Sequence, residues 1–201
     1  MPFLNQQLNL INAHLRSHSL KDKRFQTGRF ISLARLAVRN QGGTLVTMPV
    51  ELNSRHEAAW VGIDDTYPLV VYHRKLGSQY AAVAKAEYGR GNPKLQETSD
   101  MLMVVYGKAQ RLQLSASELE AQIVSGFPDN MDPAAVKDLG LTMMLVSLAQ
   151  STADSETVFA AEYKNVDFRL APEDILLSVR YTITTQFNKN CYDFCCGNAE
   201  E

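Results

Sequence analysis

The clearest pattern of hydrophobic and polar positions lies near the C-terminus, in residues 173–187. Between Ile175 and Phe187 the odd positions are mostly apolar, whereas the even positions from Ser178 to Gln186 are polar or basic. A period of two places successive side chains on opposite faces of a β-strand. We therefore expect a strand whose odd positions are buried and whose even positions form a polar face.

A helical period appears at the N-terminus. Leu4, Leu8, Ile11 and Leu15 recur at spacings of four, three and four. This spacing lays the four side chains on one face of a helix, because residues three and four apart are neighbours on a helix surface. We expect a helix over residues 5–17.

Two further segments are predicted to be helical. Ser115 and Glu118 form an S-x-x-E capping box before apolar residues at helical spacing, which predicts a helix of about three turns over residues 116–125. Apolar residues in 24–40 also permit a helix there, and Gly42 after them is a typical stop signal.

Short apolar runs bounded by turn residues predict strands. The run at 101–108 is apolar on both faces, as expected of a central strand. Pro49 cannot donate to a ladder and therefore places its strand at a sheet edge. Residues 78–100 contain Gly89 and Gly91, and we expect a strand or arm that ends in a loop. The predicted strands cover residues 44–52, 58–64, 67–77, 101–108, 141–150 and 173–187, and a short helix is expected after Asp132.

Together these elements predict an α/β (α+β) fold with a mixed or mainly antiparallel sheet packed by helices. We expect a basic helical N-terminal region over residues 1–42 and an α/β core domain over 43–188, with a loop insertion near 86–98. Residues 189–201 are predicted to be a flexible tail. This tail holds all three cysteines of the chain, Cys191, Cys195 and Cys196.

Charge is unevenly distributed along the 201 residues. Residues 1–40 hold seven of the 20 basic residues, including Arg35 and Arg39, and one of the 22 acidic residues, so their net charge is +6 and that of the remainder is −8. Opposite charges at the two ends favour contact between identical copies of the chain, and they equally favour a basic arm that binds nucleic acid. The pattern leaves both partners open, and a solvent-exposed basic helix face without a partner is the third interpretation.

Membrane insertion and secretion are not indicated. No apolar run approaches the roughly 18 residues that span a bilayer, and the first residues lack the basic and apolar stretches of a secretory signal. An odd, terminal set of cysteines argues against a disulfide framework. We therefore expect the chain to stay in the cytoplasm.

Catalytic and cofactor motifs are incomplete. The segment YGRGNPK contains G-x-G but not the rest of a phosphate-binding loop, although its Arg90 and Lys94 are candidates for contact with an anionic partner. No histidine has a serine, cysteine or aspartate at a recognisable motif spacing, and the cysteines are poorly spaced for zinc. We expect no metal, no cofactor and no enzymatic activity, with an active site assembled from distant segments as the alternative.

The stretch DDTYPLVVYHRKLG places His73, Arg74 and Lys75 directly after an apolar run. Such a cluster at the end of a buried strand suits a catalytic base, an anion site or a rim that contacts a partner. We favour the rim, because the rest of the chain offers no catalytic partner.

The order of elements resembles that of the tail terminator, or tail completion, proteins of long-tailed bacteriophages. The resemblance covers about residues 64–187 with an N-terminal helix added. It rests on the segments DTYPLVVYHRKLG, SDMLMVVYGK, SASELEAQIVSGFP, MMLVSLAQSTADS and DILLSVRYTITTQF. The chain departs from that family in its larger size, and a related neck or tail-like particle component has a similar order of elements.

The resemblance implies a non-enzymatic homo-oligomer, a hexameric ring that closes the head-proximal end of a tail tube and binds the head connector. Such a protein assembles in the host cytoplasm and then belongs to the virion tail or a tail-like particle. His73, Arg74 and Lys75 would then contact a neighbouring subunit or DNA in the channel.

Overall fold

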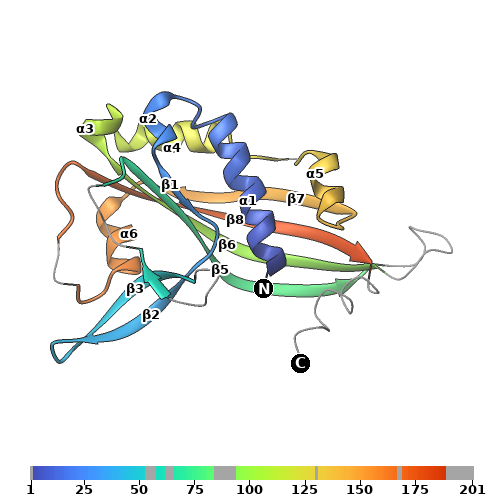
Figure 1. Ribbon diagram of the computed structural model, residues 1–201, viewed down its shortest axis with the longest axis horizontal. Helices are drawn as coiled ribbons and strands as arrows, with labels where there is room; N and C mark the ends of the chain where they lie inside the picture. Colours follow the sequence, from blue (N-terminus) through green and yellow to red (C-terminus); the bar gives the residue numbers. More distant parts are fainter. Residues whose placement is uncertain are drawn as a thin grey trace.

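The computed structural model describes residues 2–52, 58–61, 66–83, 94–129, 131–166 and 169–188. These residues form helices packed on a five-stranded sheet and a smaller three-stranded sheet (Figure 1). The helices are α1 (Pro2–Ser17), α2 (Lys23–Gln26), α3 (Ala109–Leu112), α4 (Ala116–Ser125), α5 (Pro133–Asp138) and α6 (Ser155–Glu162). The strands are β1 (Arg29–Ile31), β2 (Ala34–Gln41), β3 (Thr44–Leu52), β4 (Ala58–Trp60), β5 (Leu69–Ala82), β6 (Lys94–Lys108), β7 (Met143–Thr152) and β8 (Asp174–Asn188).

The five-stranded sheet has the order β1-β5-β6-β8-β7. Only β1 and β5 are parallel, and every other neighbouring pair is antiparallel, so the predicted mixed α+β fold is confirmed. The strand expected to be central is β6, which lies in the middle of the sheet. The period of two in β8 is also confirmed, because Val179 and Tyr181 are buried whereas Arg180 is exposed. Leu176 departs from that pattern, since it is buried on the opposite face.

One face of this sheet is covered by α1, α2, α3, α4 and α5, which contribute to a single hydrophobic core with the strands below them. The helix predicted over 5–17 is α1, and its Leu8, Ile11 and Leu15 are fully buried. The predicted capping box of α4 is present, because the Ser115 hydroxyl accepts from the Glu118 amide while the Glu118 carboxylate accepts from the Ser115 amide.

The other face is covered at one end by α6 and the three-stranded sheet (Figure 1). A second hydrophobic cluster lies between them and includes Tyr72, Val104 and Tyr163. Thr47 of β3 and Lys164 after α6 exchange two backbone hydrogen bonds of 2.9 Å, which join α6 to the smaller sheet. Helix α6 was not predicted.

The helix predicted over residues 24–40 is wrong. Only the short α2 is helical there, and β1 and β2 follow it. Gly42 and Gly43 adopt positive φ angles of 60° and 89°, which two-residue hairpin turns of the right twist require. They therefore connect β2 to β3 as a hairpin instead of ending a helix, and the N-terminal region is only partly helical.

The edge position predicted for residues 44–52 is also wrong, because β3 is the middle strand of the order β2-β3-β4. Pro49 is tolerated there because its carbonyl accepts from the Val61 amide, on the side away from β2. A residue's N and C=O point to the same side of a strand, so the missing N–H of Pro49 does not interrupt the ladder with β2.

Two boundaries differ from expectation. In the strand predicted over 58–64, residues 58–60 form β4 and Val61 is not part of it, while residues 62–64 lie outside the described residues. Residues 94–98 of the predicted loop insertion belong to β6, which pairs with β5 and β8 there. Residues 84–93 lie outside the described residues, as does the predicted cysteine-containing tail.

Candidate interaction surfaces

His73 lies in the interior between α1 and the sheet. Its side chain is fully buried, with Nε2 2.9 Å from Asn12 Oδ1 and Nδ1 2.7 Å from the Tyr181 hydroxyl. Because the amide oxygen of Asn12 can only accept, Nε2 carries the proton and Nδ1 accepts from Tyr181. Burial lowers the pKa of His73 to about 3, so the imidazole is neutral near pH 7. This network joins α1, β5 and β8.

Arg74 and Lys75 are each paired with a carboxylate of the same chain. Arg74 forms an ion pair with Glu162 of α6, which also accepts from the Tyr72 hydroxyl at 3.1 Å. Burial raises the pKa of Glu162, and the neighbouring Arg74 opposes that shift. Lys75 lies 2.8 Å from Glu97 on β6. Both cationic side chains are only 18% exposed.

The rim predicted at residues 73–75 is therefore wrong for His73, which has no exposed surface with which to contact a neighbour or DNA. Arg74 and Lys75 serve internal contacts, since one fastens α6 to β5 and the other joins β5 to β6. Residues 73–75 thus continue the buried strand that precedes them and do not form an exposed rim at its end. Neither partner carboxylate was apparent from sequence, because Glu162 is 88 positions from Arg74.

Two other predicted contact residues lie near residues 84–93. Arg90 lies outside the described residues. Lys94 is the first residue of β6, opposite Asn188 of β8, and is partly buried.

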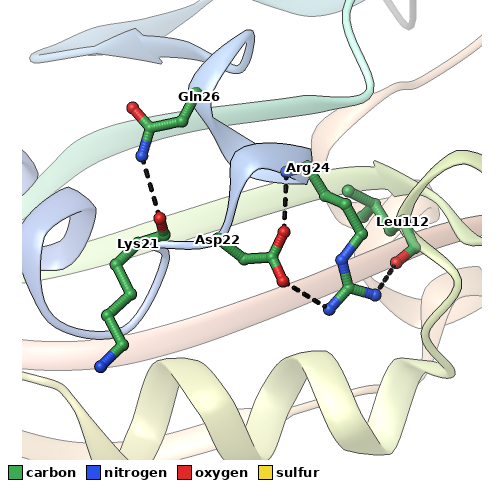
Figure 2. Close-up of polar contacts among 5 residues, drawn as sticks. All are labelled: Lys21, Asp22, Arg24, Gln26 and Leu112. Carbon is green, nitrogen blue, oxygen red and sulfur yellow. Dashed lines mark hydrogen bonds and ion pairs between the residues drawn. The ribbon is translucent and has the colours of Figure 1, made fainter.

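Three arginines of the basic N-terminal region contact other parts of the chain. Figure 2 shows Arg24 bonded to the Asp22 carboxylate and to the Leu112 carbonyl, with Lys21 pointing away from them. The hydrogen bond from Arg24 to the Asp22 side chain is the main reason why the pKa of Asp22 is lowered. Arg29 pairs with Glu51 at 2.8 Å, and the Arg16 guanidinium lies 4.3 Å from the Phe30 ring centroid. The three guanidinium groups therefore lie against the folded chain and not on a separate arm.

The predicted contact residues Arg35 and Arg39 lie on the exposed strand β2. We call the β2–β3 hairpin, residues 34–52, the hairpin arm, and Figure 1 shows it projecting from the five-stranded sheet. Among the described residues β2 pairs only with β3, so its outer edge is unpaired. Val38 and Leu45 share one face of the hairpin arm and are 64% and 61% exposed.

A second unpaired edge lies at the far side of the five-stranded sheet. Within the described ranges β7 pairs only with β8, and its Leu145 and Leu148 are 40% and 38% exposed. Large apolar side chains on an unpaired edge are unusual in a monomer, because such edges promote pairing with another chain. Neither edge was predicted from the sequence, although Gly42-Gly43 between two apolar runs is a hairpin signal.

No family model matches this chain, and no curated protein matches it. Among the described residues no group of three or more histidine, cysteine and acidic side chains could hold a metal ion. In the same part of the chain no helix is long and apolar enough to cross a membrane.

Proposed function

We propose that this chain is a structural subunit that assembles head-to-tail with copies of itself into a ring, as the tail terminator proteins that it resembles do. The proposed partners are a tail tube and a head connector, with DNA passing through the channel. The observation that carries the proposal is that β2 and β7 each have one edge that pairs with no described strand, and that each carries large exposed apolar side chains.

The two edges belong to different sheets and are different surfaces, so a contact between them would be heterologous. Heterologous contacts give rings when the rotation between neighbours closes. Adding a strand to an exposed edge is a common mode of protein association, in which main-chain hydrogen bonds supply affinity and side chains supply specificity. In the proposed ring the hairpin arm of one copy pairs with β7 of the next.

The first test is the mass of the full chain, measured by light scattering across protein concentrations. Val38→Lys and Leu145→Lys each place a charge on one edge, and lysine on an edge strand opposes pairing. We expect the unchanged chain to form a ring and each variant alone to be a monomer. Both positions are exposed, so the variants should fold; Ala121→Lys, on the exposed surface of α4, adds the same charge away from both edges and should assemble normally.

Mixing the two variants separates a head-to-tail contact from a symmetric one. Each variant retains the edge that the other has lost, so the mixture should form heterodimers that cannot grow. If the contact is instead symmetric and needs both edges of each copy, the mixture should stay monomeric. This result would exclude the head-to-tail arrangement. A chain that stays monomeric at every concentration, alone and with tube protein, would contradict the ring.

Charge on the hairpin arm supplies a second prediction. If Arg35 and Arg39 attract an acidic neighbour, assembly should weaken as salt rises, because exposed charges are screened over about 8 Å at physiological ionic strength. Arg35→Glu with Arg39→Glu should weaken it further. DNA retention that depends on salt and is lost in the same double variant, without any change of mass, would instead favour the nucleic-acid-binding alternative.

A further inference from the structure

The C-terminal ends of α1 and α4 meet beside a hollow of about 530 Å³, separate from both sheet edges. Its lining includes His14, His18, Gln122 and Asp129. The two helix ends are closely packed, because a Cβ atom added to Gly126 would lie 2.0 Å from the Ser19 hydroxyl oxygen. This volume lies within the usual range for small-ligand sites.

Two polar atoms in the lining are buried without a partner. Gln122 Oε1 and Ser19 Oγ have no hydrogen bond within the part of the chain that the structure describes. Most buried polar atoms in folded proteins are bonded, so two unbonded ones in the wall of one hollow are hydrogen-bonding groups that the described part of the chain does not use. Because an amide oxygen has only lone pairs to offer, Gln122 requires a donor.

The histidines present an acceptor as well. Their rings stack with centroids 4.0 Å apart and an angle of 14°. His18 Nδ1 lies 3.0 Å from the His14 carbonyl oxygen, which can only accept, so Nδ1 carries the proton and Nε2 of the neutral ring accepts. Burial and the neighbouring His18 lower the pKa of His14, so the His14 ring is neutral near pH 7.

The electrostatic surroundings favour positive charge. The C-terminal ends of α1 and α4 carry partial negative charge from their backbone carbonyls, and Asp129 adds a carboxylate. The titratable groups that line the hollow are His14, His18 and Asp129. Apart from the two histidines, no lining side chain can carry a positive charge.

We infer that the hollow binds a cationic nitrogen group, a guanidinium or an alkylammonium, through Gln122, Asp129 and the stacked histidines. Such a group carries several N–H donors and no acceptor, which matches an acceptor-rich lining. A flat guanidinium can also stack on an imidazole ring. The group can come from a free amine or from a basic side chain of another protein copy.

A metal ion is the competing occupant, and the geometry disfavours it. Ligating nitrogens must point at one ion in the plane of each ring, whereas these rings are stacked nearly parallel. The described residues also hold no cluster of three metal-ligating side chains.

The test is a titration of the full chain with methylguanidinium chloride, followed through the NMR signals of the histidine rings. We expect saturable shifts of His14 and His18. Gln122→Met and Asp129→Asn should each weaken binding by about tenfold, since each removes one acceptor of a charged donor. Glu120→Gln is the matched control on the same helix, outside the lining, and should bind normally. Affinity should also fall when acid protonates His14.

A shift that does not saturate, or an equal loss of affinity in Glu120→Gln, would overturn the inference. So would a response to Zn²⁺ that a chelator reverses, without any response to methylguanidinium. Light scattering with the probe present identifies the source of the cation: a lower mass assigns the site to a neighbouring copy, and an unchanged mass with saturable binding assigns it to a free amine. The titration does not depend on assembly, so it can succeed even if the ring proposal fails.

Discussion

The two faces of the five-stranded sheet are stabilised in different ways. On the helix-covered face one continuous hydrophobic core runs beneath α1 to α5, and its buried polar groups Asn12, His73 and Tyr181 bond to one another. On the opposite face, among the described residues, α6 and the three-stranded sheet cover one end, and an ion pair between Arg74 and Glu162 fastens that cover.

Toward the other end the second face is polar. Thr98 and Thr184 lie 3.3 Å apart across β6 and β8, and Gln186 donates to Gln96 at 3.1 Å. Cross-strand polar pairs of this kind stabilise a sheet without a covering layer. The helix-covered face therefore supplies the main core, whereas the second face combines a cover held by an ion pair with polar pairs between strands.

Removing the charge of Glu162 should test the fastening of the second face and have the largest effect. Glu162→Gln leaves Arg74 partly buried without a counter-ion, and breaking a buried pair typically costs about 3 kcal/mol or more in the free energy of unfolding. Urea denaturation measures this cost. Hydrogen exchange should accelerate in α6 and β3, while the amides of α1 stay protected.

The control replaces both partners, as Arg74→Met with Glu162→Leu. Since no charge is then left unpaired, most of the lost stability should return. If Glu162→Gln unfolds at the same urea concentration as the unchanged chain, the ion pair does not hold the cover in place.

The buried network of the helix-covered face should respond to pH. The unfolded chain takes up a proton at a normal histidine pKa of 6.5, whereas the folded His73 does so only near pH 3. The stabilising contribution is therefore complete above pH 6.5 and is lost as the pH falls toward 3. Between pH 7 and 5 the loss is about 2 kcal/mol.

His73→Gln removes this titration. The variant should be less stable than the unchanged chain at pH 7, yet lose about 2 kcal/mol less between pH 7 and 5. His14 also has a lowered pKa, but it is present in both chains and cancels in the difference. Parallel stability curves for the two chains over this pH range would show that His73 is not buried as a neutral group.

Sequence patterns predicted the secondary structure well where the residues of a single element determine it. The alternation in β8, the heptad-like spacing in α1 and the cap of α4 each determine a local structure without distant partners. The helix predicted over residues 24–40 was wrong because alanines such as Ala34 and Ala37 favour a helix locally, whereas pairing with β3 places them in a strand. The rim predicted at residues 73–75 was wrong for a related reason, since the partners of His73 and Arg74, Asn12 and Glu162, come from elements far away in sequence.

The smallest expected effect concerns the N-terminal cap of α4, on the helix-covered face. This local cap should contribute less to the free energy of unfolding than either buried network. Ser115→Ala removes the hydroxyl that accepts from the Glu118 amide at 3.3 Å, and lost N-caps cost about 1 kcal/mol. Ser117→Ala is the matched control, because this exposed serine lies two residues further along α4, where alanine is the better helix former. Thermal unfolding should therefore show a lower midpoint for Ser115→Ala only. Equal midpoints for both variants would mean that the cap adds nothing to a helix already held by Leu119 and Ile123 in the core.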